Sequence, residues 1–159
     1  MPFTATFQKD LFTMIKNKDF LGSIDTNAYL FRHYDLQNFA SYVNGKQIPG
    51  GGGLSLDTSH EKKTVMAYRT LFEGSGIHHS NAGLQITPEM YINSYFMLLF
   101  DLTPDRAASE IHTSHTDNGN VRIELKFSKA LPDAITCLIH IENDGSVLID
   151  DKRVETTDY

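Results

Sequence analysis

The chain has 159 residues, 40% of them hydrophobic, with a formal net charge of -6 at pH 7 and a pI near 5.5. This length allows one domain with a substantial core and is too short for two domains of typical size. The acidic balance lacks the basic footprint of nucleic-acid-binding proteins, so we expect no direct contact with nucleic acid. No stretch approaches the roughly 20 apolar residues of a membrane span, and no apolar leader follows Met1, so we expect a soluble, unsecreted protein with no membrane partner.

The N-terminal third reads as strands separated by turns. Apolar residues at strand spacing predict one strand over 3–15, which Lys9 and Asp10 could interrupt. Gly22 and Ser23 then predict a turn, followed by a second strand over 27–31.

A hairpin and a glycine loop come next. Residues 36–43 predict a strand, and Asn44-Gly45 predicts a type I′ turn into 46–48, because both central positions of that turn need positive φ. The four glycines after Pro49 predict a flexible surface loop. A phosphate-binding interpretation fails, since no Gly-Lys-Ser/Thr follows them.

Two segments have helical periodicity. Residues 61–72 place Val65, Tyr68, Arg69 and Phe72 roughly on one face, and we expect this helix to stop at 74–76, which holds two glycines. A second, shorter helix is expected after Thr87, which would be its N-cap with Pro88 at the first helical position and Glu89 in the first turn.

The segment 91–127 predicts two core strands around a polar loop. The apolar run 95–100 fits a buried strand in length, and residues 121–127 alternate apolar and charged side chains with the period of a half-buried strand. In the second strand Arg122 and Glu124 fall on the face away from the core.

The C-terminal part predicts a strand at 135–141, a glycine-containing loop and a closing strand at 147–150, with 150–159 as an exposed tail or a short edge strand. Cys137 cannot form an internal disulfide, and its apolar surroundings predict a buried, inert thiol. The elements together predict an all-β fold, an antiparallel jelly-roll β-sandwich of about eight strands with one or two short helical insertions.

Histidines invite a metal hypothesis, because a jelly roll can hold a metal with imidazoles and a carboxylate. The candidates are His78-His79 and the pair His112 and His115, with Glu110 and Asp117 near the second pair. Adjacent histidines point to opposite faces when extended, and the other pair lies in a loop that is already polar. We therefore interpret them as solvated loop residues and expect no cofactor. Retention of stoichiometric metal by the purified protein would overturn this.

No catalytic residues are expected. Asp101 and Asp105 bracket Leu102-Thr103-Pro104, and an Asp in such a segment usually caps a turn through its side-chain oxygen. The chain has no Gly-x-Ser-x-Gly elbow, and nothing in the sequence brings Cys137 and a histidine together.

A collinear series of short motifs carries a family resemblance. The series consists of Phe20-Leu-Gly-Ser, 27–34 with His33-Tyr34, Tyr42-Val-Asn-Gly-Lys-Gln-Ile-Pro49, 67–77, Tyr91 to Phe100-Asp-Leu-Thr-Pro-Asp105, Gly119 to Phe127, Ala130-Leu-Pro132 and Ile149-Asp150. From about Ile15 to Tyr159, the chain resembles the hexon-like major capsid proteins of Polinton/Maverick elements and adintoviruses. It departs from them in the four-glycine loop, in Ser94 where the family commonly has Gly, and in the His-rich loop 109–118.

The resemblance implies a structural role in a virion. Family members look like double jelly-roll capsomers that form pseudo-hexagonal homotrimers and contact neighbouring capsid proteins, and this chain is similar to the second sandwich alone. It is then either a fragment or a single sandwich kept for another use. Assembly would take place inside a host cell, in the nucleus or the cytoplasm. The family pattern singles out structural positions: Gly22, Asn44, Gly45, Pro49, Tyr68, Phe72, Gly76, Phe100, Asp101, Leu102, Thr103, Pro104, Asp105, Arg122, Glu124 and Asp150.

Two other classes of function stay open. A ligand-binding or carbohydrate-binding jelly roll would need aromatic side chains exposed on a concave sheet face, and Tyr29, Tyr34 and Tyr42 are its candidates. A metal-dependent, cupin-like enzyme is the third class, although the expected His-x-His with a downstream Glu is absent.

Overall fold

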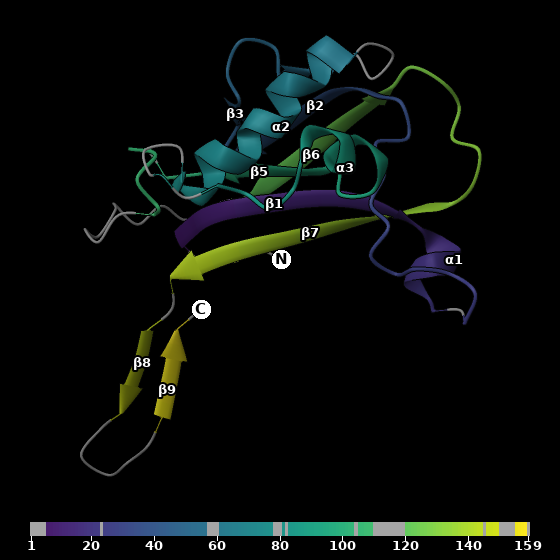
Figure 1. The fold of residues 1–159 in the computed structure, drawn as a ribbon. Helices are drawn as coiled ribbons and strands as arrows, with labels where there is room; N and C mark the ends of the chain where they lie inside the picture. Colours follow the sequence, from purple (N-terminus) through teal and green to yellow (C-terminus); the bar gives the residue numbers. More distant parts are fainter. Residues whose placement is uncertain are drawn as a thin grey trace.

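The computed structural model describes residues 6–22, 24–56, 61–77, 81, 83–103, 105–109, 120–144, 146–149 and 155–158. Its elements are β1 (Thr6–Lys16), α1 (Asn17–Phe20), β2 (Leu36–Val43), β3 (Lys46–Ile48), β4 (Leu54–Ser55), α2 (Glu61–Ser75), α3 (Pro88–Asn93), β5 (Met97–Asp101), β6 (Val121–Phe127), β7 (Ile135–Asp144), β8 (Ser146–Ile149) and β9 (Glu155–Asp158). The fold is mostly β, and the strand pairs are antiparallel (Figure 1).

Two sheets form the body. In the first, β1 lies between β5 and β7. In the second, β2 pairs with β6 along its length and with β3 and β4 on its other edge. The strands β8 and β9 form a separate hairpin, which Figure 1 shows beyond the end of β7. This arrangement is consistent with the predicted β-sandwich. The predicted jelly-roll topology stays a prediction.

The core lies between the two sheets. Alternation brings Phe12 of β1 and Phe100 of β5 to the same side, where both rings meet Phe39 of β2. The Phe39 ring stacks on Phe100 at a centroid distance of 5.2 Å and lies 4.9 Å from Phe12. These three aromatic rings tie together strands from both sheets.

The helices α2 and α3 lie beside β5. Their aromatic residues continue the core, because Tyr91 of α3 contacts both Tyr68 of α2 and Phe96. The Tyr91 hydroxyl donates to the Met97 carbonyl oxygen at 2.8 Å, so this fully buried side chain has its polar end satisfied. Burial raises the pKa of the Tyr91 hydroxyl, which stays protonated.

Several predicted elements are confirmed. The helix at 61–72 exists and continues to Ser75, and α3 begins after Thr87, whose Oγ1 accepts from the Met90 N–H at 3.2 Å. The hairpin at Asn44-Gly45 is also present, with φ of 51° and 79° at its two central residues. The N-terminal strand is a single element with a register shift between Phe7 and Lys9. Near the C-terminus, 155–158 forms β9, the edge-strand alternative for that segment.

The predicted strand at 27–31 is wrong. The Asn27 side chain accepts from the Tyr29 N–H and its carbonyl accepts from the Leu30 N–H, so local turn bonds replace a ladder. Only Phe31 is bridged, to Tyr95. The sequence also failed to predict α1 and the two-residue β4.

The predicted inward face of α2 is wrong by about one residue. Ala67 and Leu71 are buried in the core, whereas Val65, placed on the core face by the periodicity, is exposed. The close approach of Gly74 to β5 explains the rotation, because a Cβ there would lie 2.5 Å from Leu99 Cγ and 2.8 Å from the Leu99 carbonyl oxygen. Gly74, which has no side chain, therefore sets the orientation of α2 against β5.

Replacing Gly74 by Ala should destabilise the fold, although Ala normally favours a helix over Gly by about 1 kcal/mol. The added methyl group must push α2 away from β5, and overpacking of this kind costs about 1–3 kcal/mol. Urea denaturation measures the change. Gly50→Ala, at a position with open space around it, is the matched control and should be near neutral; equal effects of the two variants would contradict the packing.

The predicted burial of Cys137 is wrong. The thiol is exposed, because it lies on β7 and β7 pairs within the described residues only with β1. Its alternation places Cys137 on the core side of the sheet, opposite Met14, but at a position that the second sheet does not cover. The partial burial that remains raises the pKa of the thiol, so it is a weak nucleophile.

Candidate functional site

The strongest histidine candidates for a metal lie outside the described residues. His112 and His115 are there, as are His78, His79, Glu110 and Asp117. Among the residues that the structure does describe, no three His, Cys, Asp or Glu side chains come together as metal ligands. The metal hypothesis stays untested.

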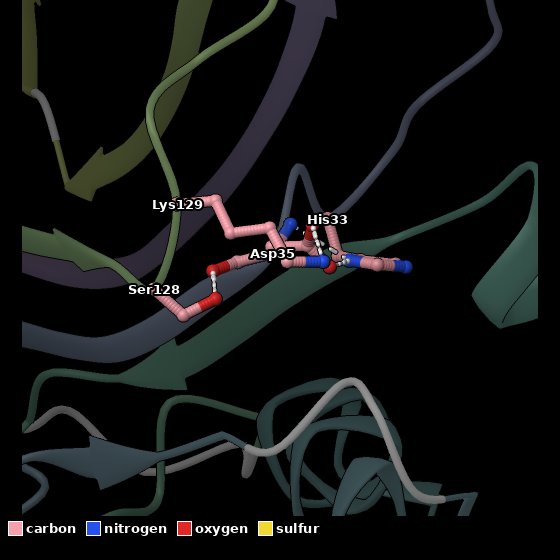
Figure 2. A network of polar contacts seen from close by, with 4 residues as sticks. All are labelled: His33, Asp35, Ser128 and Lys129. Carbon is pink, nitrogen blue, oxygen red and sulfur yellow. Dashed lines mark hydrogen bonds and ion pairs between the residues drawn. The ribbon is translucent and has the colours of Figure 1, made fainter.

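Four polar residues cluster where the β1–β2 connection meets the β6–β7 connection (Figure 2). They include the three residue types of a hydrolytic triad: His33, Asp35 and Ser128. Their hydrogen bonds differ from those of a hydrolytic triad. The Ser128 hydroxyl donates to the Asp35 backbone carbonyl at 3.1 Å, and His33 Nδ1 accepts from the Asp35 backbone N–H at 3.0 Å. Ser128 has no bond to His33 that could activate it as a nucleophile.

The contacts of this cluster hold the two connecting loops together. Lys129 Nζ lies 3.2 Å from Asp35 Oδ2, and the Ser128 N–H donates to the Asp35 carbonyl at 3.0 Å. Asp35 has a φ of 54°, a left-handed conformation that these bonds hold in place. Burial lowers the pKa of His33, which suits a neutral ring whose Nδ1 accepts a hydrogen bond.

The Asp101 to Asp105 segment is a capped turn. Asp101 Oδ1 accepts from the Thr103 N–H at 2.9 Å and from its hydroxyl at 2.6 Å, while Oδ2 accepts from the Ala108 N–H at 3.0 Å. Asp105 Oδ1 accepts from the Ala107 N–H at 3.3 Å. The Asp101 oxygens are thus used in holding the loop, the role that the sequence predicts.

Replacing Asp101 by Ala should cost about 1–3 kcal/mol of unfolding free energy, since it leaves partly buried N–H groups of Thr103 and Ala108 without their acceptor. Thermal unfolding followed by circular dichroism measures the loss. Asp105→Ala removes a longer bond at an exposed position and should cost less than half as much. A larger loss from Asp105→Ala than from Asp101→Ala would contradict this account.

A cavity of about 370 Å³ lies between α2, β5 and the β3–β4 region. Its walls are largely apolar, with Leu54, Leu99 and Phe100 among them, and it carries two guanidinium groups, from Arg69 and Arg106. Arg69 Nε is 2.7 Å from Glu73 Oε1, one helical turn away, so its charge is already compensated. The cavity has the size and composition for a small ligand with an apolar body.

The tyrosine candidates for carbohydrate binding do not form one platform. Tyr29 is exposed in a turn, whereas Tyr34 is partly buried against the core. Tyr42 is on β2 under the guanidinium of Arg122, whose Cζ is 4.3 Å from the ring centroid.

The described family-pattern positions serve turns and packing. Gly22, Asn44, Gly45 and Gly76 have positive φ. Tyr68 donates to the Ile86 carbonyl oxygen and packs against Phe72. Leu102 and Thr103 are buried, Pro49 lines the cavity, and Glu124 lies 3.8 Å from Arg122. Pro104 and Asp150 lie outside the described residues.

The sequence did not predict a set of large apolar side chains that stay exposed. They lie on and after α1, on the outer side of α2 and α3, between α3 and β5, and around β7: Phe20, Leu21, Ile24, Tyr29, Val65, Met66, Met90, Tyr95, Leu131 and Ile139. Leu21 is 74% exposed and Ile24 fully so. One feature of the sequence could have indicated their exposure: apolar residues stand on both sides of the Gly22-Ser23 turn, where polar residues are usual.

Comparisons with known proteins identify no relative. No family model matches the chain, and neither the curated proteins nor the solved structures contain a significant match. Within the part of the chain that the structure describes, no helix has the length and apolar character to cross a bilayer.

Proposed function

We propose that this chain is a structural subunit of a hexon-like capsid, in which sandwiches pack side by side into capsomers. The observation that carries the proposal is the distribution of exposed apolar side chains over separate parts of the molecule. Figure 1 places the α2–α3 pair on one side of the body and β7, with α1 beside its first residues, on the other, and each contributes to this set.

Several apolar surfaces favour a subunit with several neighbours. A monomeric binding module needs one recognition surface, and soluble monomers rarely expose large contiguous apolar patches. A shell subunit instead contacts neighbours on more than one side, since its contacts must close around symmetry axes. Phe20 and Leu21 at α1, Val65 and Met66 on α2, and Ile139 on β7 suit such contacts.

The polar clusters support the same proposal. Asp101 is used in a turn, and the His33, Asp35, Ser128 and Lys129 cluster joins two loops. A rigid sandwich with fixed loops is what a shell protein requires. In this proposal the two sheets are the halves of a jelly roll. The chain forms homotrimers when it is joined to a first sandwich. It acts in a virion that is assembled in the nucleus or cytoplasm of a host cell.

A ligand-binding module is the second candidate, and the cavity beside α2 favours it. Arg106 at its margin would take an acidic group and the apolar wall would take the ligand body. A glycan and metabolite array tests it: saturable binding that Arg106→Ala abolishes would favour this function over the capsid proposal.

Electron microscopy of the concentrated protein tests the capsid proposal. We expect regular assemblies, such as rings or lattices, because several apolar surfaces must be covered together. A uniform population of monomers at every ionic strength tested would overturn the proposal.

A further inference from the structure

Among the described residues, one edge of the strand β7 has no partner strand. The strand runs for ten residues and pairs with β1 along its whole length, while no other strand within the described residues pairs with it. Long edge strands invite pairing with another chain, and proteins usually block them with lysines, prolines, bulges or a covering element. Residues 135–141 of β7 contain no lysine or proline.

Neither face of β7 is fully covered. On the core side of the sheet, Cys137 is exposed and Ile139 is 48% exposed. On the other side His140 is exposed and Leu138 is half-buried. The strand therefore presents unpaired backbone groups together with apolar side chains.

We propose that the free edge of β7 pairs with the same edge of a second copy of this chain, antiparallel about a two-fold axis. Directly opposite residues in an antiparallel pair share a face. With Leu138 opposite Leu138 of the second copy, Ile135 falls opposite Ile141, and Cys137 opposite Ile139. The core-side face of the combined sheet is then apolar across the joint.

The charges of β7 favour a second copy as the occupant. Residues 135–141 contain no acidic or basic side chain except His140, which falls opposite Thr136 in this register. Glu142, which is exposed, falls opposite Ala134 and not opposite another acid. An acidic chain with a net charge of -6 can thus meet itself along this edge without opposing like charges directly.

The interface should be weak when it acts alone. A ten-residue strand spans only about 33 Å, and a single joint of that length contributes less than the roughly 800 Å² per partner of a stable complex. We therefore expect a monomer–dimer equilibrium at micromolar to millimolar concentration, strengthened where other contacts hold the copies together.

A charge introduced on the edge tests the pairing. Ile139→Lys places an inward-pointing lysine on the edge, the device that natural edge strands use, and should weaken dimerisation by about tenfold or more in sedimentation velocity. Ile24→Lys, at a fully exposed position outside β7, is the matched control and should leave this equilibrium unchanged. Circular dichroism verifies that both variants fold. A folded Ile139→Lys variant that dimerises like the parent would overturn the proposal.

Cross-linking tests the register. In a Cys137→Ser background, Leu138→Cys should form an interchain disulfide on mild oxidation, because this position lies on the two-fold axis. Thr136→Cys in the same background should cross-link much more slowly, since its nearest copy lies four residues along the strand. Equal rates at both positions would contradict the register.

The pairing stands on β7 alone and does not depend on the capsid function. Particles that persist in Ile139→Lys would keep the capsid proposal and reject the β7 joint. A dimer lost in Ile139→Lys, without larger particles from the parent, would support the joint and reject the capsid proposal.

Discussion

Phe39→Ala should cost about 3–5 kcal/mol of unfolding free energy, which is a large part of the 5–15 kcal/mol that holds a typical domain together. Phe39 is fully buried on β2, and its ring touches Phe12 and Phe100 on the facing sheet. Removing it leaves a cavity at the point where the two sheets are joined. Chemical denaturation followed by fluorescence or circular dichroism measures the loss.

Tyr29→Ala is the matched control for the loss of a ring. Tyr29 is 73% exposed and its aromatic ring packs into no core cluster, so its removal should change the free energy by about 0.5 kcal/mol. If Phe39→Ala cost no more than Tyr29→Ala, the two sheets would not share the core described here.

Asp10→Asn should stabilise the protein at neutral pH. The Asp10 side chain is fully buried on the central strand β1. Its Oδ2 accepts a long 3.4 Å bond from the Ser41 hydroxyl, and its Oδ1 has no partner among the described residues. Burial raises the pKa of Asp10 to about 6, against 3.8 for an ordinary Asp, and the Ser41 bond lowers it slightly. The native state thus holds a proton that the unfolded state releases.

The sign of the pH dependence follows from that proton. Between about pH 4 and pH 6 the folded state binds more protons than the unfolded state, so stability falls as the pH rises through this window. A shift of this size corresponds to a loss of the order of 3 kcal/mol. Asn cannot ionise, so this part of the pH dependence should vanish and the variant should exceed the parent by about 1–3 kcal/mol at pH 7, since its amide lacks a full set of partners.

Urea denaturation at several pH values from 4 to 7 measures this difference. Asp133→Asn is the control, because Asp133 is exposed and paired with Lys16 at 2.8 Å on the surface, where the pair contributes little. Parallel pH profiles for the parent and Asp10→Asn would show that Asp10 is already ionised without cost in the folded protein.

Local signals predicted much of the secondary structure. The Asn44-Gly45 turn, the Thr87 cap with Pro88, and the alternation of 121–127 depend on residues close in sequence, and all three elements are present. The strand expected at 27–31 failed because Asn27 bonds to its own neighbours. Periodicity could not orient α2 either, since the contact that sets it joins Gly74 to Leu99 on β5.

Burial was harder to predict than secondary structure. The alternation of β7 correctly gives Cys137 and Ile139 the same face, but their exposure depends on which strands the other sheet places opposite them. The hydrogen bonds of Asp35 with Ser128 and Lys129 join residues more than ninety positions apart. Contacts between residues so far apart in the sequence cannot be predicted from residue spacing or composition.

The central claim is that the exposed apolar side chains of this chain are covered by neighbouring subunits. The molar mass measured by light scattering, from micromolar to millimolar concentration, tests it most directly. The claim predicts a mass that rises with concentration and falls when the exposed residues Leu21, Val65 and Ile139 are replaced together by Lys. A mass that stays at the 17.9 kDa of one chain over the whole range would contradict it.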